Sequence, residues 1–100
     1  MPAPKLKDAE IQAALRDLPG WTLEKGMLEK SYKHPTFPEA IVFVSAVAQL
    51  AELANHHPDI DIRYSTITLR LTTHDSGGIT AKDVALAREV EGARRKMGSP

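Results

Sequence analysis

The sequence has the size and composition of a single globular domain. Its 100 residues are 42% hydrophobic and 26% charged, and chains divide into several domains only well beyond this length, so we expect one domain over residues 1–100. Thirteen basic residues balance thirteen acidic ones, which leaves no long-range field to gather nucleic acid or anionic lipid. The lack of Cys excludes disulfides, thiolate metal sites and a cysteine nucleophile. The start does not resemble a signal peptide, and the apolar stretch 40–54 is shorter than a membrane span needs, so we expect a cytoplasmic protein.

The first third of the sequence predicts a helix followed by a β-hairpin. Apolar residues recur at i, i+3, i+4 and i+7, and Pro19-Gly20 follows them, which indicates an amphipathic helix from about Lys7 to Leu18. Alternating apolar and polar residues then predict strands over 21–24 and 27–34, joined by a turn at Lys25-Gly26.

The second predicted helix is unusually apolar. Thr36 and Glu39 have the spacing of a capping box, which favours a helix from there to about Asn55. The only polar residues between 40 and 54 are Ser45, Gln49 and Glu52, which fall on one stripe. A single sheet covers about half of a helix, so we expect a second subunit to cover the rest, around Val44, Val47 and Ala51. The alternative is that the surplus alanines tolerate water.

The second half of the sequence predicts another hairpin and a third helix. Ile60, Ile62 and Tyr64 alternate with polar residues, and a second alternating run covers 66–73. A loop at 75–78 and a second capping-box pattern at 80–83 lead into the helix, and residues 98–100 should be frayed. We therefore predict an α+β fold of order α-β-β-α-β-β-α, a four-stranded antiparallel sheet with three helices on one face.

Three histidines lie where predicted elements end. His56 and His57 follow the second helix, and His74 follows the last strand. Any one of them could be an ordinary solvated loop residue. Glu52, however, lies one turn before His56, where its carboxylate should favour the imidazolium.

This histidine set suits proton transfer better than metal binding. Three histidines and a water could hold catalytic zinc, but adjacent His56 and His57 cannot easily direct two ring nitrogens at one ion. Imidazole exchanges protons near pH 7, and a dehydration needs both a proton donor and a proton acceptor. Neither a serine nucleophile motif nor a phosphate-binding loop is present.

Several motifs together resemble the pterin-4a-carbinolamine dehydratases, also known as dimerization cofactors of a homeodomain transcription factor. The similarity covers the run from Glu52 through His56-His57-Pro58, the aromatic Tyr64, Thr72-Thr73-His74, and the segment from Gly78 to Asp83. The sequence Leu-Pro-Gly-Trp at 18–21 also resembles the exit from the family's first helix.

The resemblance implies an enzyme that dehydrates 4a-hydroxytetrahydrobiopterin to quinonoid dihydropterin, which is recycled after aromatic amino-acid hydroxylation. It implies that His56 and His74 are the acid/base groups and that His57 binds the pterin. Glu52, Pro58 and Asp83 are implied to have supporting roles. No metal or organic cofactor is implied, and the family forms dimers or dimers of dimers. The second hypothesis is a non-catalytic module that stabilises a partner protein through the second helix; the complete histidine set favours the enzyme.

Overall fold

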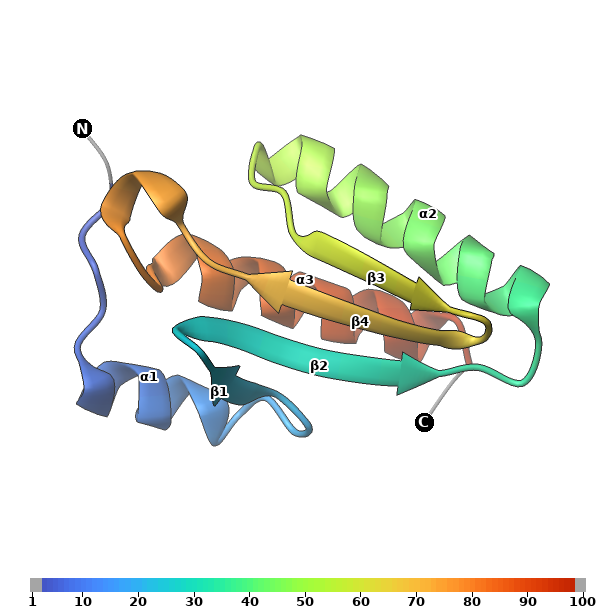
Figure 1. Cartoon of the computed structure of the whole chain (residues 1–100), viewed down its shortest axis with the longest axis horizontal. Helices are drawn as coiled ribbons and strands as arrows, with labels where there is room; N and C mark the ends of the chain where they lie inside the picture. Colours follow the sequence, from blue (N-terminus) through green and yellow to red (C-terminus); the bar gives the residue numbers. More distant parts are fainter. Residues whose placement is uncertain (1–2, 99–100) are drawn as a thin grey trace.

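The computed structural model describes residues 3–98 as an antiparallel sheet with its helices packed against one side (Figure 1). In chain order the elements are α1 (Asp8–Leu15), β1 (Thr22–Glu24), β2 (Met27–Lys33), α2 (Phe37–Ala54), β3 (Asp59–Arg63), β4 (Thr66–Leu71), the 3-10 segment η1 (His74–Ser76) and α3 (Ala81–Lys96). The strand order is β1-β2-β4-β3, with every neighbouring pair antiparallel. The predicted α+β class and element order are confirmed.

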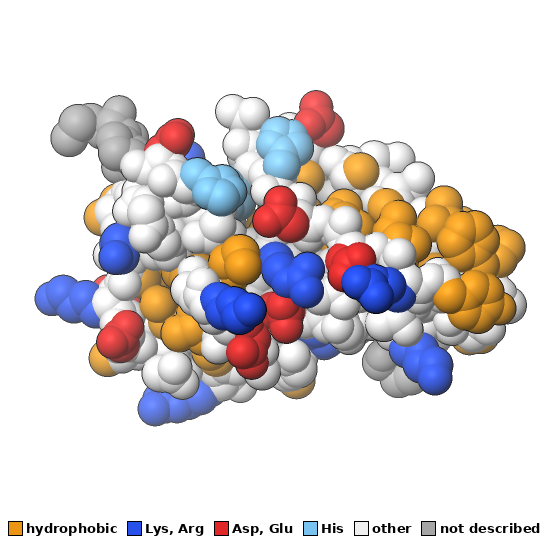
Figure 2. All heavy atoms as spheres, viewed as in Figure 1, with side chains coloured by type: hydrophobic (Ala, Val, Ile, Leu, Met, Phe, Trp, Pro, Cys, Tyr) orange, Lys and Arg blue, Asp and Glu red, His pale blue; other side chains and the backbone are white. Residues whose placement is uncertain are grey.

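The register of the sheet separates an apolar face from a polar one. Opposite Leu28 on β2 lies Leu71 on β4, and opposite Tyr32 lies Ile67; all four side chains are buried on the helix side. The other face carries pairs such as Glu29–Arg70, whose carboxylate and guanidinium are 2.7 Å apart. Figure 2 shows this uncovered face, on which acidic and basic side chains lie close together.

The helices complete one core on the apolar face. α2 contributes four buried residues and α3 contributes an apolar stripe, while α1 lies beside β1 and adds Ile11 (Figure 1). The predicted capping box is complete at α3, between Thr80 and Asp83, but only half of it forms at α2, where Thr36 Oγ1 accepts a hydrogen bond from the Glu39 amide.

Two sequence predictions about local structure are wrong. α1 ends at Leu15 rather than Leu18, because the following residues form turns in which the amides of Asp17 and Leu18 bond to carbonyls three residues back. Tyr64, which the alternation placed in a strand, lies instead in the β3–β4 turn with φ +50° and is 74% exposed. The predicted fraying of 98–100 falls largely on residues 99–100, which lie outside the described range.

The position of α2 accounts for only part of its apolar surface. Ala40, Phe43, Val47 and Ala51 are buried in the core, so the expectation that Val47 and Ala51 face another subunit is wrong. The large exposed apolar residues of this helix are instead Phe37, Val42 and Leu53. By length and mean hydropathy alone α2 could cross a membrane, but its buried face belongs to the core of the domain.

Candidate functional site

A fully buried carboxylate, Asp83, joins three segments at one end of the sheet. Its Oδ2 accepts hydrogen bonds from Thr73 Oγ1 at 2.8 Å and from the Thr80 amide at 2.9 Å. Its Oδ1 lies 2.6 Å from Nε2 of His56. Asp83 therefore ties the end of β4 and the start of α3 to the α2–β3 connection.

His56 is placed beside Asp83 by the way α2 ends. Asn55 adopts a left-handed conformation with φ +50°, and its amide bonds back to the last turn of the helix. The His56 side chain then turns toward α3 and is only 11% exposed. Because a carboxylate can only accept hydrogen bonds, Nε2 carries the proton, which leaves Nδ1 as the nitrogen available for other contacts.

Glu52 contacts His57 rather than His56. The Glu52 carboxylate and His57 Nε2 form an exposed ion pair if the ring is protonated. The expectation that Glu52 supports His56 is therefore wrong. It assumed that the helix continues to residue 56, whereas the left-handed Asn55 ends the helical repeat and directs the two rings apart.

His74 lies at the beginning of η1, directly after Thr73. Its ring is exposed and has no hydrogen-bond partner among residues 3–98, while its carbonyl accepts from the Gly77 amide at 3.0 Å. The loop expected at 75–78 is therefore a tight turn, closed by paired backbone bonds between Thr73 and Gly78. Histidine side chains gather at this end of the molecule in Figure 2.

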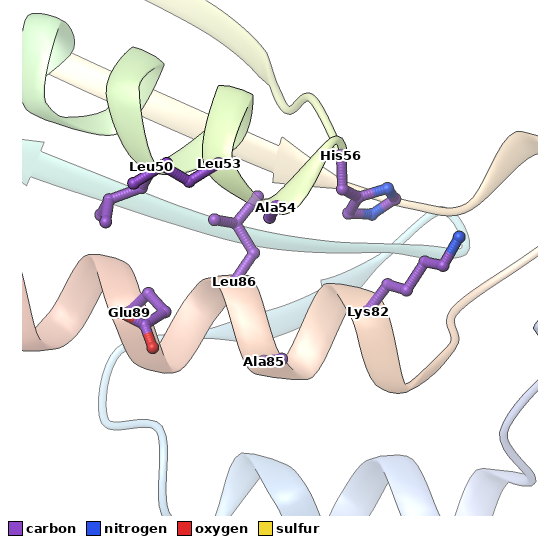
Figure 3. Close-up of a pocket in the computed structure, with 8 residues that line it drawn as sticks. All are labelled: Leu50, Leu53, Ala54, His56, Lys82, Ala85, Leu86 and Glu89. Carbon is purple, nitrogen blue, oxygen red and sulfur yellow. The ribbon is translucent and has the colours of Figure 1, made fainter.

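A cavity of about 460 Å³ lies between the end of α2 and the start of α3. Its walls are mainly apolar, with His56 and Lys82 together at one end (Figure 3). His57 and His74 do not line it. Pro58 is half-buried between His57 and β3.

Within residues 3–98 no three His, Asp or Glu side chains are grouped closely enough to hold a metal ion. The pairs at His56 and His57 instead each join one imidazole to one carboxylate, which is an arrangement that holds and moves protons.

Thr73 and Thr80, which share the Asp83 carboxylate, were not among the residues predicted to have a role in the site. Their hydroxyl oxygens are 2.8 Å apart, so both side chains belong to the network that positions Asp83. The capping-box pattern at 80–83 is the signal that could have identified Thr80. Thr73 could be found only from the three-dimensional contact, because ten residues separate it from Asp83.

Comparisons with known proteins identify the family of the chain. The model of the pterin 4 alpha carbinolamine dehydratase family matches residues 4–93. The chain belongs to this family. A relative from Roseiflexus sp. (strain RS-1), named "Putative pterin-4-alpha-carbinolamine dehydratase", is 54% identical over 89 residues, covering 89% of this chain and 96% of the relative. A relative with the same name from Nocardia farcinica is 46% identical and covers 86% of this chain and 90% of its own length.

Solved structures of the dehydratase fold extend the comparison. The crystal structure of a transcriptional coactivator/pterin dehydratase from Brucella melitensis superposes with a TM-score of 0.85 at 31% identity, covering 88% of this chain and 96% of that one. A pterin dehydratase-like RuBisCO assembly factor of the alpha-carboxysome has a TM-score of 0.59 at 22% identity, with coverage of 72% and 83%, and shares the fold.

Proposed function

We propose that this member of the dehydratase family removes water from 4a-hydroxytetrahydrobiopterin by histidine acid/base catalysis. The observation that carries the proposal is the 2.6 Å contact between His56 Nε2 and the buried Asp83. A carboxylate in this position holds one ring nitrogen protonated and stabilises the imidazolium, so that the other nitrogen can deliver and take up a proton.

In the proposed reaction the carbon–oxygen bond of the carbinolamine breaks. Nδ1–H of the His56 imidazolium protonates the departing hydroxyl, which leaves as water. The ring nitrogen on the same carbon supplies the electron pair for the new C=N bond and loses its proton to a base. We assign His74 as the second acid/base group, acting from the η1 side.

His57, Glu52 and Pro58 are proposed to hold the pterin. The exposed contact between His57 and Glu52 fixes the orientation of that ring without burying it. Replacing His57 should therefore raise KM more than it lowers kcat.

A stopped-flow assay of dehydration on freshly generated 4a-carbinolamine tests the proposal. We expect turnover well above the spontaneous rate, unchanged after exhaustive treatment with a chelator, because no metal or organic cofactor is proposed. A rate equal to the spontaneous background would contradict the enzymatic assignment. A rate abolished by the chelator would instead favour metal-assisted chemistry.

A second candidate function is a dimerization or coactivator module. It is favoured by the likeness to the Brucella melitensis transcriptional coactivator/pterin dehydratase and by the exposed apolar residues of α2. The proposed enzyme and this module can coexist, since the histidine cluster lies beyond the end of the helix. We further propose that the protein is a homodimer or homotetramer acting in tetrahydrobiopterin recycling beside an aromatic amino-acid hydroxylase.

A further inference from the structure

A second polar cluster surrounds Arg94 in the last turn of α3, whereas Asp83 lies in its first turn. The Arg94 side chain is nine-tenths buried. One terminal nitrogen donates to His34 Nε2 at 2.6 Å, and the other donates to the Lys33 carbonyl at 3.1 Å. The guanidinium also lies over the Tyr32 ring, 5.0 Å from its centroid.

All of these partners are uncharged. The Ser65 carbonyl can only accept, so His34 Nδ1 donates to it and Nε2 is left free to accept from Arg94. Burial lowers the pKa of His34, and the charge of Arg94 lowers it further, which keeps the ring neutral.

Arg94 forms no ion pair with any carboxylate in the described residues, 3–98, and its buried Nε has no hydrogen-bond partner there. Glu91 lies one turn earlier, but its Oε2 is already shared by Lys30 Nζ at 2.9 Å, Trp21 Nε1 at 3.2 Å and the Tyr32 hydroxyl. A buried cation without an opposite charge is unfavourable. The site therefore favours an anion from outside the fold.

A cavity of about 370 Å³ borders this cation. β1 pairs only with Met27–Glu29, so the rest of β2 is an open edge facing the last turns of α3. The cavity is lined by five residues of charged type: Lys30, Lys33, Glu91, Arg94 and Arg95. Lys30 and Glu91 neutralise each other, which leaves three cations. At roughly 30 Å³ per water molecule, the space exceeds what a single small ion requires.

We propose that this cavity binds a small phosphate-bearing molecule, with Arg94 as the buried charge and Lys33 and Arg95 at the rim. A phosphate group carries about −1.5 to −2 charges near pH 7 and three acceptor oxygens, which matches three cations better than one carboxylate does. The site is separated from the His56–Asp83 pair by most of the length of α3, so it is independent of the proposed dehydration.

Isothermal titration calorimetry and thermal unfolding with inorganic phosphate and pyrophosphate test the site, with ionic strength held constant by sodium chloride. We expect saturable heats and a rise in Tm. Lys33→Gln and Arg95→Gln, both at exposed positions, should each weaken binding roughly two- to fivefold. Arg88→Gln is the matched control, because Arg88 lies on α3 outside this cavity and loses the same charge.

The proposal fails if phosphate and pyrophosphate raise Tm no more than chloride at equal ionic strength. It also fails if Arg88→Gln weakens binding as much as Arg95→Gln, or if citrate binds and phosphate does not. Arg94→Lys should weaken binding more strongly than either rim variant. If that variant does not fold, the rim variants decide the question.

Discussion

At the scale of single residues, Asp83 determines what His56 can do. The carboxylate is inaccessible to solvent and also caps α3, so its hydrogen bond to His56 is held by the same contacts that hold the helix. Removing the imidazole altogether would leave a buried carboxylate without one of its partners, which is itself destabilising. A test of catalysis must separate these two effects.

His56→Ala should lower turnover by roughly 10²-fold or more if His56 is the sole acid for the substrate isomer tested. His56→Gln is the control for folding, because its amide can still donate to Asp83 but cannot transfer a proton. We expect both variants to be inactive on that isomer in the stopped-flow assay, with His56→Gln the more stable to urea.

His74→Ala should fail on the opposite stereoisomer if the two histidines serve opposite faces of the carbinolamine carbon, and the double variant should fail on both. Wild-type turnover by the double variant on both isomers, after subtraction of the spontaneous rate, would show that these histidines are not the catalytic groups.

His34 makes stability depend on pH. Its pKa in the folded protein is lowered by burial and by Arg94, so the unfolded chain binds a proton near pH 6.5 that the folded chain resists. Stability is therefore fully present above about pH 6.5 and falls as the pH drops below that value, by at most about 1.4 kcal/mol per pH unit for one proton. Burial raises the pKa of Glu91, but the hydrogen bonds from Tyr32 and Lys30 outweigh this effect, so the pKa lies below its usual value. Glu91 therefore affects the stability of the fold only at a more acidic pH than His34 does.

Urea unfolding of the wild type and His34→Gln between pH 7.5 and 5 measures this contribution. A glutamine can still accept from Arg94 but does not titrate, so the difference in unfolding free energy between the two proteins should shrink or reverse as the pH falls. A difference that is constant over this range would show that His34 does not resist protonation in the fold. The other histidines are present in both proteins, so their contributions to the pH dependence cancel in this difference.

At the scale of elements, sequence patterns predicted the strands and helices where a local rule decides them. Both capping patterns mark the true starts of α2 and α3, and alternation places β2 and β4 correctly. Two of the failures occur where the backbone conformation departs from the repeat, at Asn55 and Tyr64, both with φ near +50°. The pairing of His34 with Arg94 was not predictable, because 60 residues separate them and only the packing of α3 on β2 brings them together.

Two glycines offer a paired test of local backbone energetics. Gly20 has φ +85°, and a Cβ there would lie 2.8 Å from Cε of Lys30, whose Nζ bonds to the Pro19 carbonyl. Gly20→Ala should therefore destabilise the protein by about 1–3 kcal/mol. Gly92 lies inside α3 with open space around its Cα, so Gly92→Ala should stabilise it by about 0.5–1 kcal/mol. The denaturant midpoint should fall for Gly20→Ala and rise for Gly92→Ala. If both midpoints moved in the same direction, one of these two predictions would be wrong.

At the scale of the whole molecule, α2 has one face buried in the core and another that exposes apolar side chains. The sequence correctly indicated more apolar surface than one sheet can cover, but it could not tell which residues remain outside. The fold places Val47 in the core and leaves Leu53 86% exposed and Val42 59% exposed. Exposed apolar side chains on a helix that also packs on a sheet favour association of subunits.

We expect sedimentation at micromolar concentration to show at least a dimer, and Leu53→Glu to shift it toward the 11.0 kDa subunit. A charge at this exposed position does not disturb the core, but if the residue is covered by a partner it places an unpaired ion in the interface, which costs a few kcal/mol. Val47→Glu is the contrasting variant and should unfold the subunit itself, since that side chain is fully buried. A wild-type protein that sediments only as the monomer would exclude association through α2. An unchanged assembly in Leu53→Glu would place the interface elsewhere.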